Sequence, residues 1–206
     1  MNTFYKILAL IGLVIIIYAC GSKMNYNEMI AYIDDPDNGF VQEKTINNIT
    51  YRVSYRPTEL LIAQETRTKQ NMLSDEIHEL FEKYNNQHYF VFSISKGTSE
   101  VQYSSANQNE YAQLINKLNF NLHETIFLTS SAGDTLNLIN YHFTPTYGLT
   151  QSTDLLFFFE KEQEKVEYLQ FNIKELGLYT GNTKFRFKRK ALYSKRLKNQ
   201  HPNSKN

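Results

Sequence analysis

Histidines are the first side chains of this sequence whose spacing can be compared with catalytic and metal-binding patterns. The chain contains His78, His88, His123, His142 and His201. None of them forms an HExxH pair or another close-spaced pair of metal ligands. We expect His142 to lie at a strand end, from which it could approach His123 across a hairpin, but exposed polar residues in such places usually pair locally. The histidines therefore predict no metal site.

Two groups of carboxylates also have the composition of a reactive or metal-binding site. The first surrounds a turn and consists of Glu160, Glu162, Glu164 and Glu167. Paired carboxylates can hydrolyse glycosidic bonds, but these alternate with Lys161 and Lys165, which is typical of a solvated turn. The second group is the segment 34–39 (DDPDNG), where a calcium loop would need ligands at Pro36 and Thr45. We interpret both groups as turns.

The usual arrangements for nucleophilic catalysis and phosphate binding are missing from the sequence. No G-x-S-x-G segment is present, and the eight glycines are scattered instead of forming a phosphate-binding loop. Cys20 is the single cysteine, which excludes a disulfide framework and a multi-cysteine zinc site. We predict that the protein is not an enzyme and has no cofactor. A hydrolase with an unrecognised site is the third of three functional hypotheses.

The N-terminal segment has the pattern of an export signal. Lys6 precedes an unbroken apolar run of 11 residues, 7–17 (ILALIGLVIII). A transmembrane helix needs ~20 apolar residues, so this run is too short to span a membrane but fits a signal peptide. Its end, Ile17-Tyr18-Ala19-Cys20, places an aliphatic residue and a small residue before the cysteine. This ending resembles the lipobox of bacterial lipoproteins.

The lipobox resemblance implies that residues 1–19 are removed and that Cys20 carries a covalent diacylglycerol and an N-acyl chain. Each buried methylene contributes ~0.8 kcal/mol, and more than one chain gives stable anchoring. Gly21 follows Cys20, so there is no aspartate for inner-membrane retention, and no acidic cluster for surface export follows either. We therefore expect an anchor in the outer membrane, with the protein facing the periplasm.

Positive charge is concentrated at the C-terminal end of the chain. Residues 184–206 contain nine basic and no acidic residues, whereas residues 20–183 contain 12 basic and 21 acidic residues. Such a segment is either solvated or attracted to anionic lipid or to an acidic partner protein. Nucleic acid is not an expected partner of an exported lipoprotein. The candidate contact residues are Lys184, Arg186, Lys188, Arg189, Lys190, Lys195, Arg196 and Lys198.

A β-hairpin over residues 40–56 is the clearest local pattern. Its two arms are joined by Asn47-Asn48, a dipeptide suited to a tight turn. In the second arm apolar and polar residues alternate, which predicts a half-buried strand. We expect Tyr51 and Val53 to be buried and Arg52 and Ser54 to be more exposed.

The rest of the pattern indicates an α+β fold, in which about two helices pack on one face of a largely antiparallel sheet after an N-terminal signal segment. Helices are predicted over 58–85, with an interruption near 66–71, and over 109–120. Further strands are predicted over 88–96, 125–129, 135–143, 154–160, 167–173 and 184–192. The predicted organisation is a signal peptide (1–19), a tether (20–27), one domain (28–193) and a disordered basic tail (194–206).

Part of the domain also resembles known sequences. Asp35-Pro36-Asp37-Asn38-Gly39, the hairpin and Tyr55-Arg56-Pro57 are similar to uncharacterised lipoproteins of Bacteroidota, which have no assigned activity to carry over. The leading hypothesis is a membrane-anchored interaction or accessory module of the cell envelope, with an envelope protein as a candidate partner. The second is a carrier or sensor of a hydrophobic ligand, with Phe157-Phe158-Phe159 lining its cavity.

Replacement of the cysteine tests the lipid anchor. Because the thioether forms on the Cys20 sulfur, we expect Cys20→Ser to leave the precursor uncleaved or to release the protein from the membrane fraction. Cell fractionation combined with mass determination of the N-terminus measures both effects. A Cys20→Ser protein that is processed and membrane-bound like its parent would contradict the lipobox interpretation.

Overall fold

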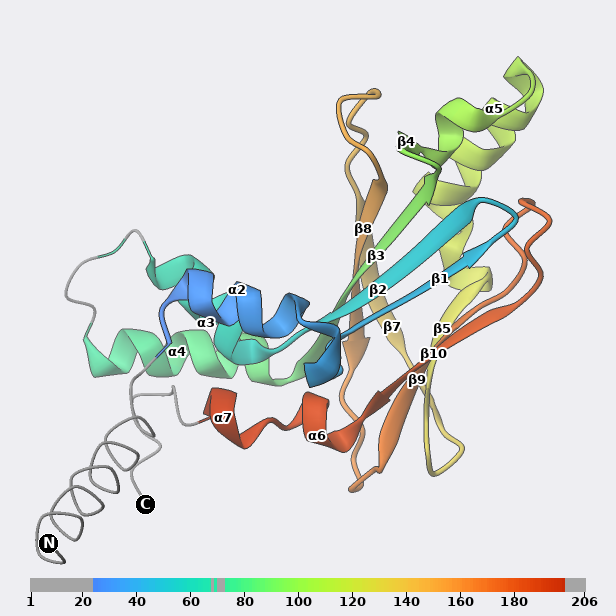
Figure 1. The fold of residues 1–206 in the computed structure, drawn as a ribbon. Coiled ribbons are helices and arrows are strands. Elements are labelled where there is room, and N and C mark those ends of the chain that lie inside the picture. Colours follow the sequence, from blue (N-terminus) through green and yellow to red (C-terminus); the bar gives the residue numbers. More distant parts are fainter. Residues whose placement is uncertain (1–23, 68, 70–72, 199–206) are drawn as a thin grey trace, which may run out of the picture.

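Two antiparallel β-sheets form the body of the protein (Figure 1). The structure is a computed structural model and describes residues 24–67, 69 and 73–198. The predicted signal peptide, Cys20, His201 and residues 199–206 of the predicted tail lie outside the described residues. The fold is α+β and antiparallel, as predicted, but the strands are divided between two sheets.

The larger sheet, sheet A, has six strands. Five follow one another in the order β1-β2-β3-β8-β7, and the short β4 pairs with the end of β3. Their bounds are β1 (Val41–Ile46), β2 (Ile49–Arg56), β3 (Gln87–Lys96), β4 (Ser99–Glu100), β7 (Leu138–Phe143) and β8 (Thr153–Glu160). The prediction that residues 88–96 form a central strand is confirmed, since β3 lies between β2 and β8.

The smaller sheet, sheet B, has the strand order β10-β9-β5-β6. Its strands are β5 (Ile126–Ser130), β6 (Thr135–Leu136), β9 (Tyr168–Ile173) and β10 (Thr183–Lys188). The predicted strand 135–143 is divided, because β6 pairs with β5 while β7 joins sheet A. Residues 162–165 likewise connect β8 of sheet A to β9 of sheet B. A sequence pattern identifies the faces of a strand but not its neighbours, which explains this difference.

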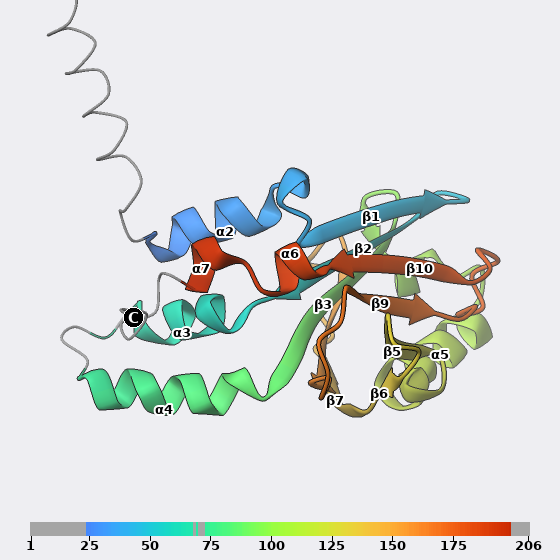
Figure 2. The ribbon, with the colours of Figure 1, turned by 90° about the horizontal axis from the view of Figure 1, so that it is seen from below.

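The helices gather at the two ends of the sheets (Figures 1 and 2). Their bounds are α2 (Tyr26–Asp34), α3 (Thr58–Thr66), α4 (Ser74–Asn85), α5 (Gln108–Asn116), α6 (Arg189–Leu192) and α7 (Lys195–Lys198). Four of these have nine residues or more, where the sequence predicted about two. The predicted interruption after residue 66 separates α3 from α4. Both lie at one end with α2, α6 and α7, and α5 lies at the other.

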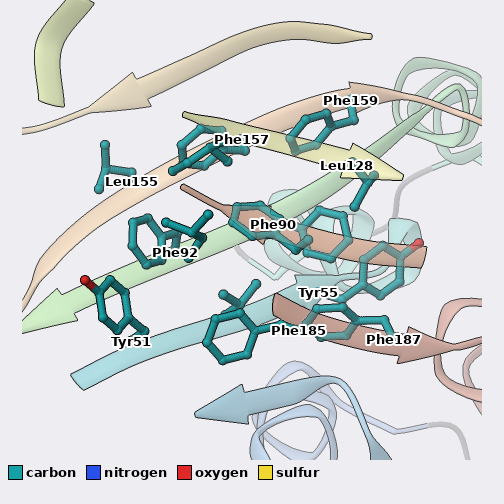
Figure 3. Close-up of a cluster of buried hydrophobic side chains, with 14 of the residues drawn as sticks. Tyr51, Tyr55, Phe90, Phe92, Leu128, Leu155, Phe157, Phe159, Phe185 and Phe187 are labelled. Atoms are coloured by element: carbon teal, nitrogen blue, oxygen red, sulfur yellow. The ribbon is translucent and has the colours of Figure 1, made fainter. Parts of the chain in front are cut away.

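Aromatic rings fill the space between the two sheets (Figure 3). The ring centroid of Phe90 in sheet A lies 5.4 Å from Phe171 and 5.2 Å from Phe187 in sheet B. Phe157 meets Phe171 edge to face, at 5.6 Å and 87°. Each such pair contributes ~0.5–1.5 kcal/mol beyond the burial of its area. Phe157 and Phe159 of β8 are therefore part of the core, whereas Phe158 lies on the other face and packs on Tyr89.

The predicted hairpin forms with the predicted turn. Asn47 and Asn48 have φ angles of 50° and 63°, which fit the type I′ turn that joins twisted strands. The inward-facing residues of β2 are buried as predicted, namely Ile49, Tyr51, Val53 and Tyr55. The prediction of a more exposed Ser54 was wrong: Ser54 is buried like Tyr51 and Val53, between the buried Val41 of β1 and the partly buried Val91 of β3.

Side chains of β1 connect the edges of the two sheets. The Gln42 side-chain amide donates to the carbonyl oxygen of Arg186, and its Oε1 accepts the Arg186 N–H at 3.1 Å. Lys44 donates to the carbonyl oxygen of Lys184 at 2.6 Å. Gln42 thus bonds to β10 as a neighbouring strand would, and it occupies an edge that would otherwise be open to pairing.

The chain beyond β10 is more ordered than predicted. The predicted strand 184–192 ends at Lys188, and α6 and α7 follow it. Leu192 and Leu197 are both buried. The prediction of a disordered tail from residue 194 was therefore wrong for residues 194–198, because Leu197 packs into the core.

Replacement of Gln42 tests the connection between the sheets. We expect Gln42→Leu to lower the free energy of unfolding by about 1–3 kcal/mol, because two hydrogen bonds to the main chain of β10 are lost. Urea unfolding measures the change. Gln64→Leu, at an exposed position of α3, is the matched control and should be nearly neutral. Equal effects of the two substitutions would contradict a specific role for Gln42.

Candidate functional site

Cations on β10 form the candidate functional site, which we call the basic strand surface and define as Lys184, Arg186 and Lys188. All three are exposed, while the residues that alternate with them are buried. The Arg186 guanidinium lies 4.1 Å from the centroid of the Tyr168 ring and donates to Gln170 Oε1 at 3.2 Å. The pleat of β10 therefore directs the three cations to the outer face of sheet B, as the alternation of residues predicted.

Arg189 was predicted to contact a membrane or partner, but in the structure its side chain makes contacts within the fold. Its guanidinium donates to the carbonyl oxygen of Val166 at 3.1 Å and lies 4.6 Å from the centroid of the Tyr193 ring. Arg189 is only partly exposed and makes contacts within the fold, so we remove it from the contact surface. The other predicted contact residues are the exposed Lys190 and Arg196 and, within α7, Lys195 and Lys198.

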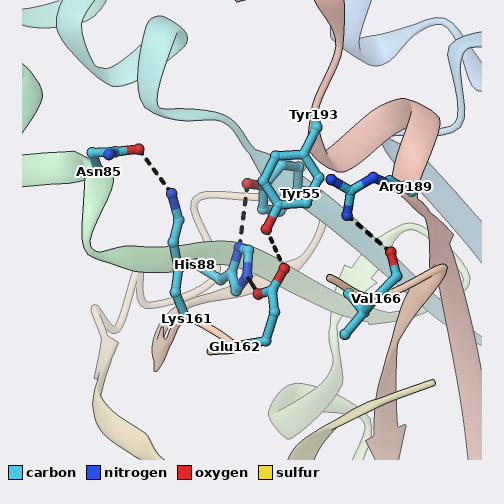
Figure 4. Close-up of polar contacts among 8 residues, drawn as sticks. All are labelled: Tyr55, Asn85, His88, Lys161, Glu162, Val166, Arg189 and Tyr193. Carbon is cyan, nitrogen blue, oxygen red and sulfur yellow. Dashed lines mark hydrogen bonds and ion pairs between the residues drawn. The ribbon is translucent and has the colours of Figure 1, made fainter. Parts of the chain in front are cut away.

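A buried hydrogen-bonded group, the His88 network, consists of His88, Glu162, Tyr55 and Tyr193 (Figure 4). His88 Nε2 lies 2.5 Å from Glu162 Oε2, and His88 Nδ1 lies 3.3 Å from the Tyr55 hydroxyl. The Tyr193 hydroxyl donates to the other Glu162 oxygen. The side chains of His88 and Glu162 are 0% and 5% exposed. The prediction that Glu162 belongs to a solvated turn was therefore wrong.

Burial sets the protonation of the His88 network. It lowers the pKa of the His88 imidazole and outweighs the hydrogen bond to Glu162, which acts in the opposite direction. Burial also opposes ionisation of Glu162, but hydrogen bonds from His88 and Tyr193 hold the pKa of its carboxyl below the ordinary value. Burial raises the pKa of Tyr55 well above its ordinary value. A neutral imidazole then donates a hydrogen bond to the Glu162 carboxylate through Nε2 and accepts a hydrogen bond from the Tyr55 hydroxyl through Nδ1.

The His88 network connects distant parts of the chain and satisfies its polar groups internally. His88 belongs to β3, Glu162 follows β8, and Tyr193 follows α6. Lys161, next to Glu162, donates to Asn85 Oδ1 at 2.9 Å and adds a contact to the end of α4. Since the polar atoms of the network are already paired, we assign it a structural role.

Two further carboxylates organise loops. Glu175 accepts the main-chain N–H groups of Gly177, Leu178, Tyr179, Thr180 and Gly181. Glu100 is 1% exposed and accepts the N–H groups of Gly148 at 2.7 Å and Thr150 at 3.3 Å. Burial would raise the pKa of both carboxyls, yet these hydrogen bonds lower it. Both side chains therefore stabilise turns as carboxylates.

The part of the chain that the structure describes contains no group of three or more His, Cys, Asp and Glu side chains that could hold a metal ion. Segment 34–39 forms a turn, as predicted, in which Asp35 Oδ1 accepts the Asp37 N–H at 3.0 Å. His142 Nε2 lies 3.0 Å from Thr144 Oγ1. Within the same residues, we find no helix with the length and apolar character needed to cross a bilayer.

Comparisons with known proteins identify no family. No protein-family model matches the chain, and no curated protein matches it. Among solved structures, a novel protein of unknown function from Burkholderia pseudomallei is similar, with 10% sequence identity and a TM-score of 0.36. The similarity covers 86% of this chain and 96% of that chain. At this TM-score we base no argument on the similarity.

The pH dependence of stability tests the His88 network. Because the pKa of His88 is lowered in the folded protein, the unfolded chain binds more protons below about pH 6.5, the ordinary value for histidine. The free energy of unfolding should therefore fall as pH decreases through this range. We expect His88→Gln to remove this loss, so that the remaining acid sensitivity begins near the ordinary carboxyl pKa of ~4.3. Urea unfolding at a series of pH values measures the slope.

His78→Gln is the matched control for this experiment, because His78 is exposed on α4. This variant should keep the pH dependence of the parent protein. If His88→Gln and the parent lose stability in parallel between pH 7 and pH 5.5, the neutral state assigned to His88 is wrong.

Proposed function

We propose that the protein is a lipid-anchored, non-catalytic interaction module of the bacterial cell envelope. In this proposal Cys20 carries the lipid, and the folded body faces the periplasm at the outer membrane. The observation that carries it is the basic strand surface, which projects three exposed cations from one strand. A lipid anchor would keep these cations near the bilayer, where each contributes ~1 kcal/mol of attraction to an anionic surface.

The composition of sheet B supports this proposal. Its four strands contain three cations and no aspartate or glutamate. Lys174, directly after β9, lies 5.6 Å from the ring centroid of Phe127 of β5 and adds a cation beside the sheet, while the exposed Glu167 before β9 and Asp134 before β6 add carboxylates. Since the chain between residues 20 and 183 is acidic overall, the positive charge of this sheet is a local property.

The two other functional hypotheses have less support. A carrier with a cavity lined by Phe157-Phe158-Phe159 has less support, because the rings of Phe157 and Phe159 pack against Phe171 of sheet B. A hydrolase needs a carboxylate or histidine that can reach a substrate. The carboxylates of Glu100, Glu162 and Glu175 instead accept hydrogen bonds within the fold.

Binding to lipid vesicles tests the basic strand surface. We expect the chain from residue 20 onward, with Cys20→Ser to prevent acylation, to bind phosphatidylglycerol vesicles at low salt and to dissociate as salt screens the attraction. The double variant Lys184→Gln, Lys188→Gln should bind at least about tenfold more weakly, since ~2 kcal/mol of attraction is lost. Co-sedimentation measures the bound fraction.

The matched control replaces two exposed lysines elsewhere, Lys96→Gln and Lys165→Gln, which changes the net charge equally. This variant should bind nearly as well as the parent. Substitution is preferable to removal of residues 194–206, because the removal would delete the buried Leu197. Equal weakening by both double variants, or binding independent of salt, would refute the proposed surface.

A further inference from the structure

A cleft of about 410 Å³ is lined in part by residues of α5. This helix lies at the opposite end of the molecule from α2, α3 and α4 (Figure 1). The volume of the cleft lies within the range of ~300–1,000 Å³ that is common for small-molecule sites. Asn47 of the hairpin turn, Lys96 at the end of β3 and the loop 175–179 form one side. One face of α5 and its continuation forms the other, with Glu110, Gln113, Leu114 and Lys117.

Apolar side chains form the base of the cleft. Ile49, Leu114 and Leu176 line it and are 3%, 7% and 3% exposed, respectively. Leu178 also lines the cleft and is partly exposed. A ligand with an apolar body would therefore find an apolar surface here, flanked by polar groups, which is the usual composition of a small-molecule site.

Two lysines, Lys96 and Lys117, lie in the cleft together with two carboxylates, those of Glu110 and Glu175. Glu175 already accepts five main-chain N–H groups, and Glu110 accepts one at the start of α5, at 3.0 Å. Lys117 donates to the carbonyl oxygen of Leu176 at 3.1 Å, which uses one of its three N–H donors. Lys96 has no ion pair within the described part of the chain. The free N–H donors of Lys96 and Lys117 therefore suit an anionic acceptor.

Tyr179 lines the cleft in an uncommon backbone conformation. Its φ angle is 58°, in the left-handed region that a bulky residue rarely adopts, and the residue is 90% exposed. Two hydrogen bonds fix its main chain: its N–H donates to Glu175 at 3.0 Å, and its carbonyl oxygen accepts from Asn47 Nδ2 at 2.7 Å. Residues with a strained backbone are frequent at binding sites, although Tyr147, which is outside the cleft, has a similar φ angle of 55°.

We propose that this cleft binds a small organic anion, namely a carboxylate carried on a short apolar chain. The carboxylate lies between Lys96 and Lys117, the apolar chain lies on the leucine and isoleucine base, and the Tyr179 ring covers it. This inference uses different residues from the basic strand surface and does not depend on the membrane anchor. Failure of one proposal therefore leaves the other standing.

Octanoate is the probe, titrated into the chain from residue 20 onward that carries Cys20→Ser. We expect one binding site by calorimetry, with changes in the NMR signals of Lys96, Lys117 and Tyr179. Octanamide, which has the same chain and no charge, should bind at least about tenfold more weakly, because the charge-assisted hydrogen bonds are lost. Octylammonium should not compete with octanoate.

Two pairs of variants test the location of the site. Gln113→Trp places a large side chain in the cleft and should abolish octanoate binding, whereas Ala112→Trp, at an exposed position of the same helix outside the cleft, should not. Lys96→Gln should weaken binding about fivefold or more, while Lys165→Gln leaves it unchanged. Absence of binding at millimolar octanoate, equal affinity for octanoate and octanamide, or binding that survives Gln113→Trp would overturn the proposal.

Discussion

Aromatic packing between the two sheets is the constraint on which the rest of the structure depends. Phe171 of β9 lies 5.4–6.2 Å from four rings of sheet A, those of Phe90, Phe92, Phe157 and Phe159. Because side chains alternate along a strand, each ring directed inward forces its neighbours outward. Phe185 and Phe187 are buried in this way, so the cations between and beside them face away from the core. A register change of one residue would bury the cations, which makes their direction a consequence of the core.

Carboxylates are the second organising feature, because buried and partly buried ones determine how several loops and the C-terminal segment attach. Glu100, Glu162 and Glu175 come from different parts of the chain, and each accepts at least two hydrogen bonds from groups in the fold. A buried charge without such partners would be strongly destabilising, so complete pairing is a condition of stability. The same pairing leaves these side chains little capacity for acid–base chemistry. Some of the acidic residues of the chain therefore serve to hold its loops by accepting main-chain hydrogen bonds.

Local features of the fold were predictable from the sequence, and contacts between distant segments were not. The alternation in β2 and the Asn47-Asn48 dipeptide define a hairpin by themselves, since both signals act between neighbouring residues. The division of residues 135–143 between two sheets leaves no such signal. For the His88 network the sequence contained part of a signal, because a histidine within an apolar strand needs a hydrogen-bond partner when it is buried. Its partner, Glu162, lies 74 residues away among lysines, where a solvated turn was the natural interpretation.

The central claim has two parts. Packing of the core directs Lys184, Arg186 and Lys188 outward from sheet B, and we propose that this face contacts an anionic surface. Paramagnetic relaxation in NMR tests it most directly, with the isotope-labelled chain bound to phosphatidylglycerol nanodiscs that contain a lipid with a nitroxide headgroup. The account predicts that the amide signals of Lys184, Arg186 and Lys188 broaden most, while those of Thr50 and Ser93, on the outer face of sheet A, broaden little. Equal broadening on the two sheets, or stronger broadening at Thr50 and Ser93, would contradict it.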